Sequence, residues 1–278
     1  MLRLLTIELH KLRYNKSAKV ISIVYFILIT FIALISSIEF NFGAINFRIA
    51  DQGIFNFPYI WHFNSYIAAI LKLFLAIVIV SMTANEYSNK TLKQNLIDGL
   101  SKKEFILSKF ITVVLFSLVS TLFVFGVSLI LGLIFSDYNE PGIIFSDIAY
   151  LFAYFVKLIG FFSFCLFLGI LVKRSAFALG FLLIWSISEG IIYSIFKWKI
   201  FKDTDIAESM IQFFPLTAMS NLIKEPFSRL GAVQTAANQL GEAFDKDYSV
   251  QSLTVIIVMV WTFLFIFGSY YILKRRDL

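Results

Sequence analysis

Three charged side chains lie inside long apolar runs, and they are the residues whose position could do chemistry. Lys72, Lys157 and Glu189 are each flanked by uncharged, mostly aliphatic or aromatic residues. Ionised groups in hydrocarbon are costly and usually face a bundle interior or a cavity. We expect Glu189 to pair with Lys72 or Lys157, and geometry favours Lys72 because both lie at similar depth. A structural ion pair, a contact with cargo or an ion, and extension of Lys72 to the interface all remain open.

The rest of the sequence excludes several kinds of catalytic site. No G-x-x-x-x-G-K-[ST] motif occurs, so the chain has no P-loop for a nucleotide. One cysteine, Cys165, and two histidines without HExxH or CxxC leave no credible zinc site. The apolar runs contain one acid and no histidine, too few for a known intramembrane protease mechanism. We therefore expect no catalytic residue, metal or cofactor on this chain, and any ATP and Mg²⁺ to be bound by a partner.

The elements that must position these residues are predicted to be membrane-spanning helices. Hydrophobic residues make up 59% of the 278 residues and charged ones 15%, whereas soluble domains are nearer half and a quarter. A crossing helix needs about 20 apolar residues. Six runs qualify, and the predicted spans are residues 20–38, 65–84, 105–135, 148–172, 175–196 and 251–273. The sequence predicts one all-α integral membrane domain, residues 1–278, embedded in the lipid bilayer.

The distribution of basic residues predicts the orientation. Cytoplasmic loops carry an excess of lysine and arginine. With a cytoplasmic N-terminus, 15 of the 24 such residues fall on the cytoplasmic side. We expect both termini to be cytoplasmic, and the net charge of +6 to reflect this bias and not nucleic-acid binding.

An amphipathic helix is predicted at the N-terminus, residues 1–19. Leu2, Leu5, Leu9 and Leu12 recur at helical spacing. Such a helix is expected to lie in the cytoplasmic interface.

The segment between the second and third spans is predicted to form a short helix, a sharp break and a new helix. Leu92, Leu96 and Leu100 share one helical face with Ile97, and Gly99 is placed to end the helix. Ser101 and Glu104 form a capping box that starts the next helix. The segment could be an ordinary connector, but a short helix rigidly joined to two spans is also what a motor protein would need to push on them.

The longest predicted outer loop, residues 197–250, contains a charge-free stretch at 209–223 interrupted by Pro215. Fifteen residues reach only about 22 Å as a helix, too short to span. We expect a re-entrant or interfacial helical hairpin.

The order of these elements resembles the permease subunit of ABC-2 type ATP-binding-cassette exporters. Shared features are the N-terminal helix, six spans, a Glu-x(n)-Thr-x(n)-Gly-x-Ser-[Arg/Lys] segment and a Pro-containing outer hairpin before the last span. The residues that carry the resemblance are Glu86, Thr91, Gly99, Ser101, Lys102 and Lys103, followed by Phe105 and Lys109, and in the hairpin Phe214, Pro215 and Asn221. Family members often have arginine after the serine, so Lys102 departs from the pattern and puts a bidentate contact in doubt.

The resemblance implies a function and partners. Residues 86–101, the coupling segment, would sit on a separate cytoplasmic ABC ATPase, with the N-terminal helix as a brace. Its expected coupling residues are Glu86, Thr91, Leu92, Leu96, Gly99, Ser101 and Lys102, and a groove on the ATPase would cover the exposed leucines. The resemblance further implies a second permease copy or paralogue, export of a cargo by alternating access, and a place in the bacterial cytoplasmic (inner) membrane.

Two other functions remain open. The chain could be an ABC-2-like membrane anchor or force transmitter without cargo flux. It could also be an ion-coupled secondary transporter, which would use ionisable groups near the midplane and often has internal repeats. No convincing repeat is present, and the identity of the cargo cannot be read from the sequence.

Overall fold

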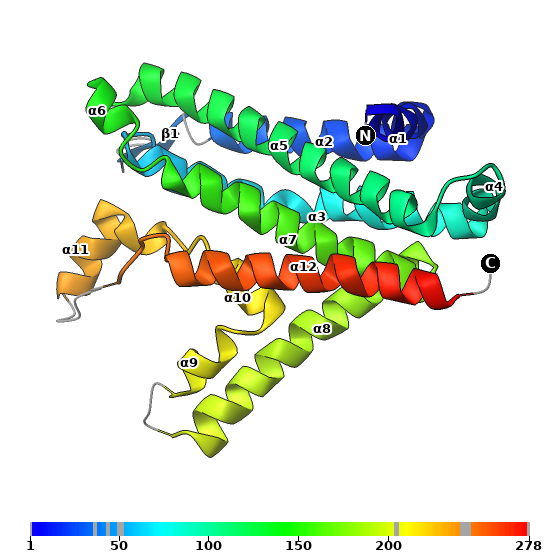
Figure 1. The fold of residues 1–278 in the computed structure, drawn as a ribbon. Coiled ribbons are helices and arrows are strands. Elements are labelled where there is room, and N and C mark those ends of the chain that lie inside the picture. Colours follow the sequence, from blue (N-terminus) through cyan, green and yellow to red (C-terminus); the bar gives the residue numbers. More distant parts are fainter. Residues whose placement is uncertain are drawn as a thin grey trace.

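The computed structural model describes residues 2–35, 38–42, 45–48, 53–202, 206–239 and 246–276. Its elements are α1 (Leu2–Tyr14), α2 (Lys16–Ile35), β1 (Glu39–Phe42), β2 (Ile45–Arg48), α3 (Tyr59–Ser88), α4 (Thr91–Ile97), α5 (Lys102–Phe135), α6 (Pro141–Ile144), α7 (Ala149–Val172), α8 (Ser175–Ile195), the π-helix η2 (Phe196–Ile200), α9 (Ile206–Ile211), α10 (Pro215–Asn221), the 3-10 turn η3 (Phe227–Arg229), α11 (Gly231–Gln239) and α12 (Ser252–Arg275). Figure 1 shows their arrangement as a helical bundle.

Six helices are long and apolar enough to cross a membrane, which confirms the predicted number of spans. They are Lys16–Ile35, Tyr59–Ser88, Lys102–Phe135, Pro141–Val172, Ser175–Ile200 and Ser252–Arg275. The second begins at Tyr59 and not at Ser65, because Pro58 fixes its start and the first turns are buried in protein. The predicted first span reached Ile38, but residues 36–37 lie outside the described part of the chain, as do 203–205 and 240–245 of the outer loop.

The centre of the bundle is α7, which contacts α3, α5, α8, α10 and α12. Nearly every side chain on its inner turns is buried, including Phe162, Phe164 and Cys165. The approach of α12 is close at Gly160, where an added Cβ would meet Val258 Cγ1 at 2.7 Å. Small residues permit such close helix packing within membranes, where no hydrophobic effect drives helices together.

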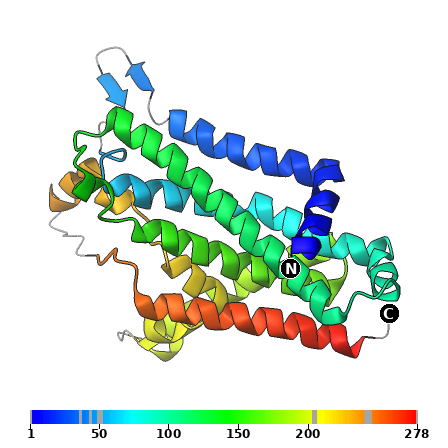
Figure 2. The ribbon, with the colours of Figure 1, turned by 45° about the horizontal axis from the view of Figure 1, so that its top comes forward.

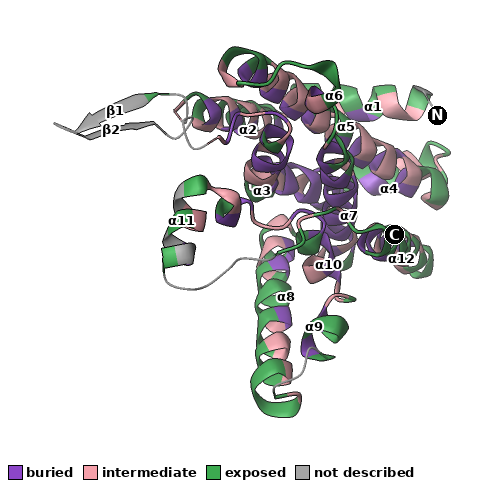
Figure 3. Cartoon of the chain, turned by 90° about the vertical axis from the view of Figure 1, so that its left-hand side faces the viewer, coloured by how far each residue is buried: buried purple, intermediate pink, exposed green. Residues whose placement is uncertain are grey.

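Helix α8 leaves this bundle at an angle (Figures 1 and 3). A left-handed Lys173 and an extended Arg174 end α7 and redirect the chain into α8. Most of α8 is exposed, and its buried residues are Ala178, Leu182 and Glu189. The short helices α9 and α10 lie between α8 and the bundle, so the space beneath α8 is partly closed by protein.

Different elements lie at the two ends of the bundle. Helices α1 and α4 and the C-terminal end of α12 lie at one end, and the two-stranded hairpin, α6 and α11 lie at the other (Figures 1 and 2). The hairpin pairs Glu39 with Arg48 and Phe42 with Ile45 in antiparallel register. The arrangement places α1 and the C-terminal end of α12 at a common end, while the cytoplasmic assignment of that end stays a prediction.

Candidate functional site

The coupling segment has the geometry that its sequence predicts. Helix α4 ends before Gly99, which has a φ of +97°. Ser101 then caps α5: its Oγ accepts from the backbone N–H of Glu104 at 3.1 Å, and the Glu104 carboxylate accepts from the Ser101 N–H at 2.9 Å. Both halves of the capping box are present, so the angle between α4 and α5 is set by local structure.

The apolar stripe of α4 does not face outward as expected. Leu92 is 1% exposed and belongs to the core, while Leu96 and Leu100 pack partly buried against it. The prediction of an exposed leucine face is therefore wrong. The physical reason is that α4 lies against the end of α3, and the chain's own bundle covers the stripe. The apolar side chain that α4 does expose is Ile97, at 74%.

Glu86 lies at the centre of an ionic cluster formed by Glu8, Lys11, Glu86 and Lys109. The Lys109 ammonium pairs with a Glu86 carboxylate oxygen and with Glu8 Oε2 at 2.6 Å. Lys11 Nζ lies 3.0 Å from Glu86 Oε1 and 3.3 Å from Glu8 Oε1. The Lys109 side chain is fully buried. The cluster thus fastens α1 to the junction of α3 and α5.

The charges of this cluster change the pKa of Lys11, its most exposed member. Partial burial alone would lower the pKa of Lys11, but the opposite charges of Glu86 and Glu8 outweigh it and raise the pKa above 10.5. The two carboxylates therefore favour the protonated form of Lys11, the form that pairs with Glu86 and Glu8.

The remaining expected coupling residues have separate positions. Thr91 is exposed at the start of α4, and its hydroxyl reaches back to the Glu86 carbonyl at 3.5 Å. Lys102 Nζ donates to the carbonyls of Lys274 and Arg276, at 3.2 and 2.8 Å. Carbonyls at a helix C-terminus favour cations, so Lys102 fixes the end of α12 next to the coupling segment.

Glu189 does not pair with a lysine, which overturns the predicted ion pair with Lys72 or Lys157. Its carboxylate accepts four hydrogen bonds: from Trp185 Nε1 at 2.8 Å, from the backbone N–H groups of Leu216 and Thr217 at 3.1 and 2.8 Å, and from Thr217 Oγ1 at 2.9 Å. The first N–H groups of a helix have no partner within that helix. Glu189 supplies those partners for α10 from the neighbouring helix, and this is why it needs no cation.

The two intramembrane lysines have neutral partners instead. Lys72 Nζ donates to the Ala69 carbonyl at 3.0 Å and lies 4.7 Å from the centre of the Phe161 ring. Lys157 Nζ donates to the Ser220 carbonyl at 3.4 Å. No carboxylate among the described residues forms an ion pair with either lysine.

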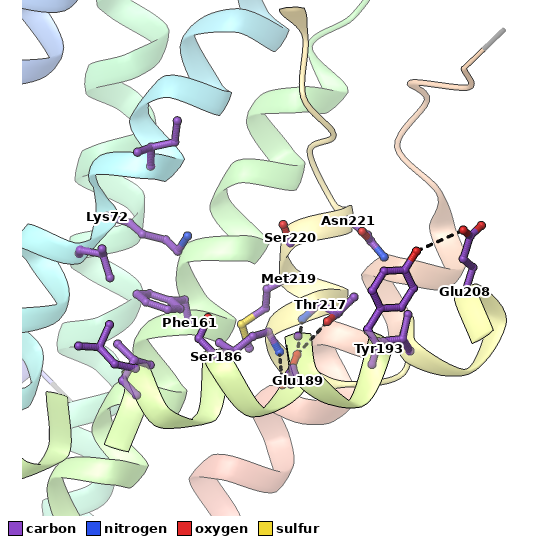
Figure 4. Close-up of a pocket in the computed structure, with 17 residues that line it drawn as sticks. Lys72, Phe161, Ser186, Glu189, Tyr193, Glu208, Thr217, Met219, Ser220 and Asn221 are labelled. Carbon is purple, nitrogen blue, oxygen red and sulfur yellow. Dashed lines mark hydrogen bonds between the residues drawn. The ribbon is translucent and has the colours of Figure 1, made fainter. Parts of the chain in front are cut away.

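A cavity of about 730 Å³ lies between α8 and the bundle, and we call it the α8 cavity. Its polar lining includes Lys72, Ser186, Glu189, Thr217, Ser220 and Asn221 (Figure 4). Lys72 projects into it from α3, opposite the Glu189 network on α8 and α10. Two of the three intramembrane charges singled out in the sequence therefore line one cavity.

The predicted hairpin is present as α9 and α10 joined by a short turn. Pro215 occupies the first turn of α10 and is buried, Phe214 precedes it as the N-cap residue, and Asn221 is exposed at the end of α10 on the cavity wall. Whether the hairpin re-enters the membrane stays a prediction.

Sequence reasoning missed Glu8 as a functional residue. The signal was available, because Glu8 lies on the same helical face as Leu5 and Leu12. Leu5 and Leu12 are half-buried, Leu9 is 41% exposed, and the side chain of Leu2 is not described. A charge within a stripe that packs on protein indicates a buried partner, here Lys109.

Comparison with known proteins identifies the family. The sequence matches the family described as ABC-2 family transporter protein over residues 4–197, more than half of the chain. The matched region includes most of α1, the coupling segment, the ionic cluster and all of α8. A search of curated proteins finds no match. Six apolar helices together with this match show that the chain belongs to the ABC-2 transporter family, as a multi-pass membrane component of transport.

Proposed function

We propose that this chain is the permease subunit of an ATP-driven exporter and that a separate cytoplasmic ABC ATPase, which binds ATP and Mg²⁺, engages the coupling segment. The observation that carries the proposal is the fixed attachment of α4. Gly99 and the Ser101 capping box set the angle to α5, and the ionic cluster ties the end of α3 to α1 and α5. A displacement of α4 would therefore move three helices together.

The exposed face of α4 is the proposed seat of the ATPase. Ile97 is 74% exposed, with Lys93 and Gln94 exposed one turn earlier. In the proposed complex Ile97 is the apolar residue of this face that a groove on the ATPase would cover, with the polar residues around it at the rim. Leu92, on the buried face of α4, anchors the helix to the bundle.

Two permease copies or paralogues, in the bacterial inner membrane with both termini cytoplasmic, complete the proposed transporter. ATP binding would close the ATPase pair and shift the spans between two states with different access, since a ligand shifts an equilibrium only by binding one state more tightly. The cargo would leave toward the end of the bundle that carries the β1–β2 hairpin, α6 and α11.

Two alternatives make different predictions. An anchor or force transmitter would keep the ATPase contact but carry no flux. An ion-coupled secondary transporter would use Lys72 and Lys157 as ion-linked groups and would need no ATPase. The rigid coupling segment favours the ATP-driven proposal over the second.

Ile97→Asp tests the proposal directly. After co-expression with the ABC ATPases of the same genome, purified wild-type chain should retain one of them, and Ile97→Asp should lose it while remaining folded. Ile7→Asp, at an aliphatic position on α1 at the same end that is less exposed (40% against 74%), is the control for a new charge at this end of the bundle. Full ATPase retention by Ile97→Asp would contradict the coupling assignment. Flux into proteoliposomes that needs ATP separates the exporter from the anchor, and flux driven by an ion gradient alone would favour the secondary transporter.

A further inference from the structure

The α8 cavity contains a positive charge that the described part of the protein leaves without a counter-ion. An ammonium group has three N–H donors. Lys72 uses one for the Ala69 carbonyl and lies over the Phe161 ring, which offers its π-electrons and no lone pair. The hydrogen bond to Ala69 leaves the ammonium with donor capacity, and the Lys72 side chain projects into the cavity (Figure 4).

The described acidic residues that line the cavity, Glu189 and Glu208, form no ion pair with Lys72. The four donors around Glu189 come from α8 and α10 and engage both carboxylate oxygens. Glu208 pairs with Lys197 at 2.8 Å and accepts from the Tyr193 hydroxyl at 3.3 Å. Each acid already has its own partners.

A second lysine, Lys157, lies behind the cavity wall. It is 4% exposed and donates to the carbonyl of Ser220, which lines the cavity. Among the described residues that line the cavity, Lys72 is the cation, and an acidic group is the partner that matches an ammonium with charge-assisted hydrogen bonds.

The walls of the cavity that face away from the bundle are apolar and open to the side. Ile70 and Leu73 on α3 and Leu183 on α8 line the cavity and are 53%, 48% and 60% exposed. These helices are candidate spans, so the exposed side chains contact acyl chains in a bilayer. A ligand of matching chemistry has an acidic head and an apolar tail.

We propose that the α8 cavity binds a phospholipid-like amphiphile with a net-negative phosphate headgroup, which Lys72 holds by charge-assisted hydrogen bonds. Ser220 and Asn221 line the facing wall, on α10, and offer hydroxyl and amide donors for the remaining phosphate oxygens. The tail lies along Ile70, Leu73 and Leu183. The inference rests on the proposed function in naming the class of cargo, but the binding itself needs neither ATPase nor nucleotide.

Binding is measured on the full chain alone, in nanodiscs of phosphatidylcholine, with a photoactivatable phosphatidylglycerol as the probe. Wild-type chain should be labelled by phosphatidylglycerol in preference to the matching phosphatidylcholine probe. Hydrogen bonds to charged groups contribute about 1.5–3 kcal/mol, so Lys72→Gln should weaken phosphatidylglycerol binding by about tenfold or more. Lys72→Arg, which keeps the charge, is the matched control and should retain binding.

Two results would overturn the inference directly: no preference for phosphatidylglycerol in the wild type, or phosphatidylglycerol binding by Lys72→Gln that equals the wild type's. Displacement of the lipid by free glycerol 3-phosphate at equal concentration would also overturn it, because the site would then be assigned to a soluble phosphate. If Lys72→Gln does not fold, a photo-crosslinking residue at Leu183 in otherwise wild-type chain tests the same point, because it must label phosphatidylglycerol over phosphatidylcholine. Failure here leaves the ATPase contact at Ile97 intact, and loss of that contact leaves lipid binding intact, so the two proposals fail separately.

Discussion

Replacing Lys109 with methionine should be among the most destabilising single changes at the α1 end of the protein. The Lys109 side chain is fully buried, and its partners Glu8 and Glu86 are 3% and 7% exposed. Methionine fills similar space but leaves two buried carboxylates that share only Lys11. Removing one partner of a buried ion pair costs about 3–5 kcal/mol, because the other charge remains desolvated.

The matched comparison is Lys11→Met. Lys11 contacts the same two carboxylates at 3.3 and 3.0 Å, but its side chain is 36% exposed. Solvent screens such a pair, and its loss should cost about 1 kcal/mol or less. Adding Glu8→Gln to Lys109→Met should recover part of the loss, since it removes one of the unpaired charges, with an interaction energy of about 0.5–3 kcal/mol.

Unfolding in mixed micelles measures the free energy of unfolding of each variant, and limited proteolysis near Arg13 reports whether α1 has detached. The expected order of destabilisation is Lys109→Met, then the double variant, then Lys11→Met, with cleavage at α1 greatest for the first and least for the last. If Lys109→Met costs no more than Lys11→Met, the cluster does not hold α1 and the proposed brace is wrong.

Four further predictions follow from single positions. Gly99→Ala should cost about 1–2 kcal/mol of stability in a thermal unfolding assay and reduce ATP-dependent coupling. A Cβ at this position meets no atom within 4 Å, so the penalty comes from the positive φ alone. Gly99→Asn should therefore cost less in the same assay, and equal costs would refute this cause. Glu189→Leu should leave the α10 N–H groups unpaired and cost at least about 1–3 kcal/mol more than Glu189→Gln in chemical unfolding, with no difference counting against the cap. The hydrogen bond and charge of Lys197 lower the pKa of Glu208 from 4.5. The ion pair between α9 and η2 should therefore be present above about pH 4.5 and be lost as the pH falls through the lowered pKa. A spin label at Met210→Cys should gain mobility on acidification in wild type but not in Glu208→Gln. A cysteine at the exposed Asn139 should react with an impermeant reagent only from outside, and labelling only from the cytoplasm would reverse the orientation.

The helices and their breaks were predictable because they depend on local chemistry. Runs of about 20 apolar residues indicate spans, and the positive φ of Gly99 and the Ser101 capping box follow from residues three or four positions apart. The predicted family was confirmed for the same reason, since it rested on the order of such elements.

The partners of buried polar groups were not predictable in the same way. Residue count places Glu189 and Lys72 at similar depth, but depth does not fix the side of the helix on which each lies. Glu189 instead satisfies the N-terminus of α10, a helix whose position depends on a long loop. The inward face of Leu92 likewise depends on how α4 folds back on α3, a tertiary contact that periodicity cannot distinguish from a partner's groove.

The inclination of α8 links the protein to the thickness of its membrane. Together with η2 it forms a continuous helical segment of 26 residues, mostly apolar up to Phe196, which at 1.5 Å per residue is about 39 Å long, against about 30 Å of hydrocarbon. A helix that exceeds the bilayer accommodates the mismatch by tilting, and the tilt decreases as the bilayer thickens. Because α8 forms one wall of the cavity that contains Lys72, a change in its tilt would change the shape of that cavity. We therefore expect the acyl-chain length of the surrounding lipids to affect access to the cavity, independent of any ligand or nucleotide.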